Sequence, residues 1–190
     1  MPNHITNKIK FYGEQSNINK VLELIKGEGE CIDFNKIVPM PSNIYRGNLG
    51  FEERKKYGAN NWYDWSVTHW GTKWNAYYSH LDEDTNTMCF DTAWSSPMPI
   101  LEALAKLCYE HRVWFEGKWA DEDRGHNVGT FESDCDNDEY WFSYEYVENC
   151  SNEAYEIYVE LKGSDMCMGK DANGNWIAYD CDDCPNAGQC

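Results

Sequence analysis

The order of its periodic segments limits the fold of this chain more than any other feature. Over residues 5–12 apolar side chains alternate with polar ones, which is the pattern of a strand buried on one face. Residues 16–26 instead carry apolar side chains at helical spacing, with Ser16 as the expected N-cap and Gly27 as the stop. The chain therefore begins with a strand followed by a helix.

The same two periods recur after a long interruption. Two strands, a helix opened by prolines and a last strand are expected over residues 74–81, 87–93, 97–108 and 113–119. The order strand, helix, strand, strand, helix, strand is the ferredoxin-like βαββαβ plan, an α+β fold with both helices on one face of an antiparallel sheet. Residues 31–72 form an insertion between the first helix and the second strand.

The insertion shows weaker signals. Extended chain is expected over 31–45, because Pro39 and Pro41 prevent a continuous helix there. Short helices are expected over 52–56, where charged residues cluster, and over 62–70.

Residues 131–190 are expected to form an acidic, β-rich extension of a ferredoxin-like domain at 1–130. Its expected strands are 128–132, 140–147 and 176–179. The last one follows a hairpin turn at Asn173 and Gly174. Residues 151–162 fit either a helix or a strand, and Ser151 as a cap favours the helix.

Four segments together resemble the YubB ferredoxin-like family, whose members come from phages, prophages and plasmids. The segments are Pro2–Ile9, Phe34–Pro41, Trp70–Asn75 (Trp-Gly-Thr-Lys-Trp-Asn) and Phe90–Pro97 (Phe-Asp-Thr-Ala-Trp-Ser-Ser-Pro). The resemblance covers about residues 1–130 and implies a ferredoxin-like fold and an origin in a mobile element. It implies no activity.

Charge is distributed unevenly along the chain. The 190 residues hold 16 Lys and Arg against 33 Asp and Glu, a formal charge of −17. Residues 1–120 hold 13 against 15, a net charge of −2, whereas residues 121–190 hold 3 against 18, a net charge of −15. Direct binding to nucleic acid is not expected, because binding to phosphates depends on Lys and Arg.

The acidic third also contains many aromatic residues. An acidic surface with aromatic side chains can attract a basic partner and then anchor on it. The leading hypothesis is an interaction protein that binds a basic surface of a host protein, with inhibition of a nucleic-acid-binding defence factor by charge mimicry as its concrete form. A solubilising surface is the alternative. The candidate binding acids are Asp134, Asp136, Asp138, Glu139, Glu145 and Glu148.

A second candidate site surrounds the Trp-Gly-Thr-Lys-Trp segment. Its tryptophans can stack on a ligand and Lys73 can donate hydrogen bonds, which makes an enzyme or small-ligand pocket the second hypothesis. The alternative is a helix end fixed to the sheet by large aromatic side chains, with Lys73 paired to Asp91. The residues concerned are Trp70, Thr72, Lys73, Trp74, Asp91 and Trp94.

The cysteines suggest a compartment and one metal site. An odd count of nine and the lack of a signal-peptide pattern predict a reducing, cytoplasmic location in the host cell. Cys181 and Cys184 form a C-x-x-C pair which, with Cys167 and Cys190, could coordinate a zinc ion, giving a zinc-stabilised module as a third hypothesis. Reduced thiols and a redox pair remain alternatives.

Other function classes find no support in the sequence. No apolar run approaches the roughly 18 residues needed to cross a membrane. The five histidines form no spaced pair, and neither a phosphate-binding loop nor a nucleophile elbow occurs. No catalytic residue or cofactor other than zinc is therefore expected, and the chain is expected to be a monomer or a homodimer.

Overall fold

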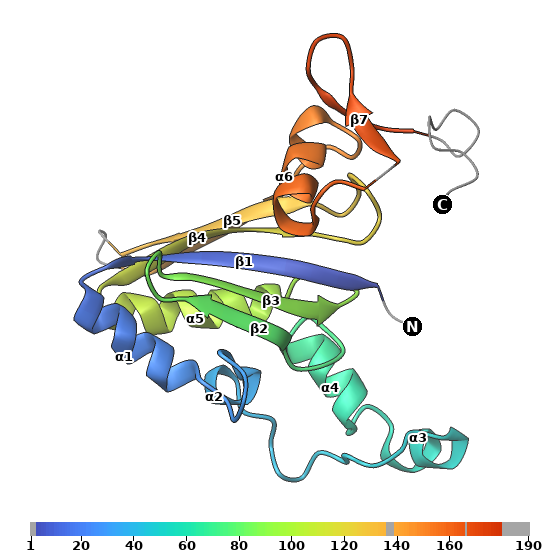
Figure 1. Cartoon of the computed structure of the whole chain (residues 1–190). Coiled ribbons are helices and arrows are strands. Elements are labelled where there is room, and N and C mark those ends of the chain that lie inside the picture. Colours follow the sequence, from blue (N-terminus) through green and yellow to red (C-terminus); the bar gives the residue numbers. More distant parts are fainter. Residues whose placement is uncertain (1–2, 136–138, 166, 180–190) are drawn as a thin grey trace.

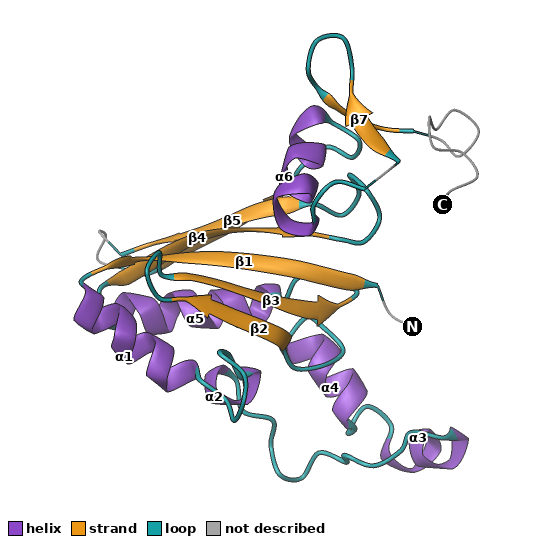
Figure 2. Ribbon diagram, viewed as in Figure 1, coloured by secondary structure: helices purple, strands orange, loops and turns teal. Residues whose placement is uncertain are grey.

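The computed structural model describes residues 3–135, 139–165 and 167–179, and the elements follow the expected order closely (Figure 2). They are β1 (His4–Gly13), α1 (Gln15–Ile25), α2 (Phe34–Ile37), α3 (Phe51–Tyr57), α4 (Trp62–His69), β2 (Tyr77–Asp82), β3 (Thr87–Ala93), α5 (Met98–Glu110), β4 (Val113–Ala120), β5 (Gly129–Asp134), β6 (Trp141–Tyr146), α6 (Asn152–Lys162), β7 (Met168–Lys170) and β8 (Trp176–Ala178).

Six strands form one antiparallel sheet in the order β2-β3-β1-β4-β5-β6. The first four positions are those of a βαββαβ unit, so the predicted ferredoxin-like α+β fold is confirmed. β1 lies at its centre, paired with β3 along one side and with β4 along the other.

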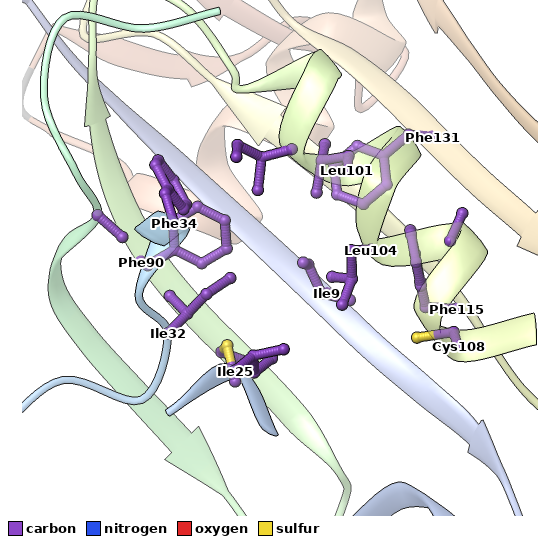
Figure 3. Packing of buried hydrophobic residues seen from close by; sticks show 14 of the residues in the cluster. Ile9, Ile25, Ile32, Phe34, Phe90, Leu101, Leu104, Cys108, Phe115 and Phe131 are labelled. Atoms are coloured by element: carbon purple, nitrogen blue, oxygen red, sulfur yellow. The ribbon is translucent and has the colours of Figure 1, made fainter. Parts of the chain in front are cut away.

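The helices are divided between the two faces of the sheet (Figure 1). α1 and α5 lie on one face together with α2 and α4, and α6 lies on the other. Alternate residues of β1, including Ile5, Ile9 and Phe11, are buried against α1 and α5. Figure 3 shows Ile9, Leu101 and Leu104 among the side chains that fill this layer. The period of two in β1 thus identified the face that carries the main core.

One polar side chain interrupts that face. Asn7 is fully buried, and its amide nitrogen donates to the hydroxyl of Thr92 at 3.0 Å and to the carbonyl of Ile5 at 3.1 Å. Its amide oxygen accepts from Ser96 at 2.6 Å. Because buried polar groups are stable only when hydrogen-bonded, this network ties β1 to the segment that leads from β3 into α5.

The insertion differs from expectation in its first part. Residues 34–37 form a helical turn where extended chain was predicted, because Asp33 caps it by accepting a 2.9 Å hydrogen bond from the Asn35 amide. The turn ends at Ile37, and Val38, the residue before Pro39, is extended as the proline rule requires. The predicted helices in the rest of the insertion correspond to α3 and α4.

Two predicted boundaries are also corrected. β2 begins at Tyr77 rather than at residue 74, because the Asn75 side chain accepts from the amides of Phe34 and Ala76 and holds this stretch as a loop. α1 begins at Gln15, so Ser16 lies within the helix and is not its cap.

Beyond β4 the sheet continues without a break. The boundary expected at residue 130 falls inside β5, which pairs with β4 on one side and β6 on the other. Two large rings cross over glycines here: added Cβ atoms would lie 2.3 Å from Phe131 at Gly117 and 2.1 Å from Trp119 at Gly129. Glycine at both positions is what allows these rings to pack against the neighbouring strand.

The ambiguous segment 151–162 is a helix, and Ser151 caps it by accepting from the Ala154 amide at 3.1 Å. Its apolar side packs on β4 and forms a second, smaller core. Beyond it, the predicted hairpin at Asn173 and Gly174 joins β7 to β8. None of the helices in the described residues is long and apolar enough to cross a bilayer.

We expect Asn7→Ala to lower the free energy of unfolding by about 2–4 kcal/mol, because it leaves the buried Ser96 and Thr92 hydroxyls without their amide partner. Chemical denaturation measures the loss. Lys10→Ala on the exposed face of the same strand is the control and should change stability by about 0.5 kcal/mol or less. Equal losses for the two variants would contradict a structural role for the network.

Candidate interaction surface

Two residues of the Trp-Gly-Thr-Lys-Trp segment point inward. The Trp70 indole is 4% exposed, donates to the Val38 carbonyl at 2.9 Å and packs edge-on against Phe34. Thr72 is buried, and its hydroxyl donates to the Ala93 carbonyl at 2.8 Å and accepts from the Ala93 amide at 3.1 Å. Trp70 thus fixes the end of α4 to α2, and Thr72 fixes the following loop to the end of β3, so both side chains have structural partners and little exposure.

The other residues of this segment face solvent. The Lys73 ammonium lies between two indole rings, 4.4 Å from the centroid of Trp74 and 4.7 Å from that of Trp94. Both rings are more than a third exposed. The three side chains form a small surface cluster held together by cation–π attraction.

Asp91 belongs to the opposite face of the sheet. It accepts from the Thr6 hydroxyl at 2.8 Å, and the same hydroxyl accepts from the Lys162 ammonium of α6 at 3.1 Å. Burial lowers the pKa of Lys162, and the nearby Asp91 carboxylate acts against that shift. Among the described residues no ion pair joins Lys73 to Asp91, so the six candidate residues do not line one pocket.

The face of the sheet that carries α6 is polar and hollowed, with a groove of about 820 Å³ along it. Lys8 and Lys118 are direct neighbours across β1 and β4, and both donate to Glu160 of α6, at 2.9 and 2.7 Å. Partial burial acts to raise the pKa of Glu160, but the hydrogen bonds from the two lysines outweigh it and lower the pKa below its usual value. Sequence reasoning missed this clamp because its members are more than 40 residues apart.

The candidate acids gather around the outer strands of the sheet. Glu145 lies on β6 opposite Thr130, with Glu132 of β5 on the same face. Glu139 and Glu148 flank β6 and are exposed. Asp134 ends β5, where its carboxylate accepts from the Cys135 amide at 2.6 Å. The candidates Asp136 and Asp138 lie outside the described residues.

Exposed aromatic side chains lie on the same outer strand. Trp141, Tyr144 and Tyr146 of β6 are 44%, 49% and 64% exposed, and Tyr140 just before the strand is 37% exposed. Phe142 instead packs against Phe115 in the main core. The aromatic density was visible in the sequence, but the position of β6 at the edge of the sheet was not.

The cysteines give one described candidate ligand. Cys167 is buried beside β7, and its amide donates to Asp165 at 2.8 Å. The other candidates, Cys181, Cys184 and Cys190, lie outside the described residues. Within the part of the chain that the structure describes, no three potential metal ligands come together.

Sequence reasoning missed one close contact between a cysteine and a histidine. The exposed Cys150 thiol lies 3.5 Å from Nε2 of His126. The two residues are 24 positions apart and belong to different loops, so no local sequence motif predicts the contact.

We expect Glu160→Gln to loosen α6, because it leaves the neighbouring Lys8 and Lys118 ammonium groups without their shared counter-ion. The pair is partly exposed, so the loss in unfolding free energy should be about 1 kcal/mol. Since the folded-state pKa of Glu160 is lowered, its contribution is complete above its ordinary value of 4.5 and is lost as the pH falls through the lowered pKa. Hydrogen exchange of α6 amides at several pH values measures the effect.

Glu153→Gln on the same helix is the control, since Glu153 is exposed and forms no ion pair with either lysine in the described residues. A similar loosening by both variants, or a loss that does not depend on pH, would contradict the clamp.

Comparison with known proteins agrees with this architecture. No curated protein and no solved structure shows significant similarity to the chain. Residues 73–163, from the loop before β2 to the end of α6, match the family model of the ferredoxin-like domain in Api92-like proteins. This match supports the ferredoxin-like fold and takes in β6 and α6, whereas the YubB family and its origin in mobile elements stay predictions. Residues 73–163 are thus similar to the ferredoxin-like domain found in Api92-like proteins, and the architecture of the chain has the same fold.

Proposed function

We propose that this chain is an interaction protein that binds a basic surface of a partner protein through its acidic C-terminal third. The observation that carries the proposal is the coincidence of charge and exposed aromatic side chains on one strand. Residues 121–190 hold a net charge of −15, and β6 presents Trp141, Tyr144 and Tyr146 beside Glu139, Glu145 and Glu148.

The two kinds of side chain have different roles in such a complex. Carboxylates spread over a surface attract a basic partner over about 10 Å at moderate salt, and they raise the association rate more than the affinity. Exposed Trp and Tyr rings supply the apolar contact area that slows dissociation. The Lys8–Glu160–Lys118 clamp is compatible with this arrangement because Glu160 offsets part of the positive charge of the two lysines on β1 and β4.

The finer form of the proposal concerns the identity of the partner. Carboxylates on an exposed strand can occupy a surface that otherwise binds phosphates, so a nucleic-acid-binding protein is the partner that fits the charge best. The resemblance to YubB proteins of mobile elements suggests a host defence factor in the cytoplasm, by analogy alone.

We expect the triple variant Glu139→Lys, Glu145→Lys and Glu148→Lys to lose partner binding by a factor on the order of ten to a hundred at low salt. The reversed charges would repel the basic surface that the native carboxylates attract. A pull-down from host lysate at about 0.05 M and about 0.3 M salt, with quantified recovery of basic proteins, measures the change.

The control is a second triple variant, Glu28→Lys, Glu52→Lys and Glu83→Lys, which alters the net charge equally at exposed positions far from β6 in the sequence. It should retain binding. If both triple variants recover the same proteins as the native chain, the proposal is wrong.

A further inference from the structure

We infer that the partner contributes an extended segment that pairs with β6 as a seventh strand, in the groove between β6 and α5. This inference rests on the proposed function, because it specifies how a basic partner is held. It adds that backbone hydrogen bonds, and not charge alone, form the complex.

β6 has one side free to pair. It ends the strand order, and within the described residues no strand lies on its outer side. The Val147 amide donates to the Val128 carbonyl at 3.0 Å, which makes these two residues a hydrogen-bonded pair. Because such pairs alternate along an antiparallel ladder, Phe142, Tyr144 and Tyr146 direct their N–H and C=O groups outward.

The two edges of the sheet are protected to different degrees. On the opposite edge, the register of β2 shifts between Tyr77 and His80, and Tyr78 has a φ of 53°. Such a bulge prevents another strand from pairing there. β6 keeps an uninterrupted register with β5 and contains neither proline nor lysine, the residues that commonly block an edge. The structure thus leaves one regular edge open.

A hollow of about 440 Å³ lies beside that edge, on the face covered by α5. Met98 and Pro99 of the first turn of α5 line it together with Phe142 and Tyr144. An added strand would place alternate side chains in this hollow, where apolar ones fit. Glu102 of α5 lines it too and is exposed, so it can pair with a cationic side chain at the rim.

The negative charge around β6 indicates which kind of segment can pair with it. The other face of an added strand would lie near Glu145 and Glu132, which favours Lys or Arg at the alternate positions. A second copy of this chain carries the same formal charge of −17 and would be repelled. The occupant is therefore a segment of a different protein in which basic and apolar residues alternate.

The probe is a fluorescent peptide of about eight residues in which lysine and valine alternate, since that is close to the length of a strand. Its control has the same composition and charge, but N-methyl groups on every second residue prevent pairing along one edge. Fluorescence anisotropy measures both affinities. We expect the methylated peptide to bind about tenfold more weakly or worse, because backbone hydrogen bonds are lost.

The matched protein variants are Tyr144→Pro and Tyr144→Ala. Proline removes an outward N–H without breaking a bond to β5, whereas alanine removes the ring and keeps the N–H. Tyr144→Pro should weaken peptide binding about tenfold more than Tyr144→Ala. If the proline variant fails to fold, the two peptides still decide the question on the native chain.

The outcomes separate the inference from the function on which it rests. No binding of the lysine–valine peptide, or equal affinity for both peptides, overturns strand addition. If both peptides bind the native chain equally and neither binds the triple charge variant at positions 139, 145 and 148, strand addition is wrong but the proposed function stands. Binding that is indifferent to this variant and to salt overturns the proposed function. A native dimer that Tyr144→Pro dissociates identifies a second copy as the occupant and overturns the inference.

Discussion

The pairing of β1 with both β3 and β4 is the contact on which the rest of the structure depends. It places a ten-residue strand in the middle of the sheet, so its two faces define two different environments. Ile5, Ile9 and Phe11 direct one face into the core beneath α1 and α5. Lys8 and Lys10 direct the other face toward a polar groove that α6 covers only in part. A shift of one residue in this register would exchange the two faces.

β4 joins this central part of the sheet to the strands of the C-terminal third of the chain. Its glycine at 117 and its Trp119 fit the complementary Phe131 and Gly129 of β5, which fixes the register of the added strands. Pairing with β5 then determines which side chains of β6 lie on each face of the sheet and which side of β6 forms its edge. Glu132, Asp134 and Glu145 are thus carried by strands of the same sheet, and α6 is held over that sheet by Glu160 and Lys162. The packing between β4 and β5 thus determines where the acidic side chains of the outer strands lie.

Sequence patterns predicted the elements well because each element depends on its own period and caps. They predicted contacts poorly where partners are distant. Asn7 sits at a core position of β1, and its amide is satisfied there by Thr92 and Ser96, which are 85 and 89 residues away. The position of Asp91 on the strand next to Lys73 suggests a pair between them, but strand alternation places Asp91 on the face of α6. The short helix after Asp33 forms because the Asp33 side chain caps it. The prolines that follow it led to a prediction of extended chain instead. The regular edge of β6 follows from strand order, which no local pattern contains.

A regular edge strand rich in aromatic residues is normally a hazard, because identical edges pair and aggregate. In this chain three carboxylates lie on or beside this edge strand, at Glu139, Glu145 and Glu148. Like charges on two copies repel each other, so the carboxylates hinder pairing between the edge strands of two free molecules. The same carboxylates would attract a strand of opposite charge, as proposed above. On that proposal, solubility and partner recognition are not competing explanations for the acidic third, because one arrangement of charge around one open edge would serve both.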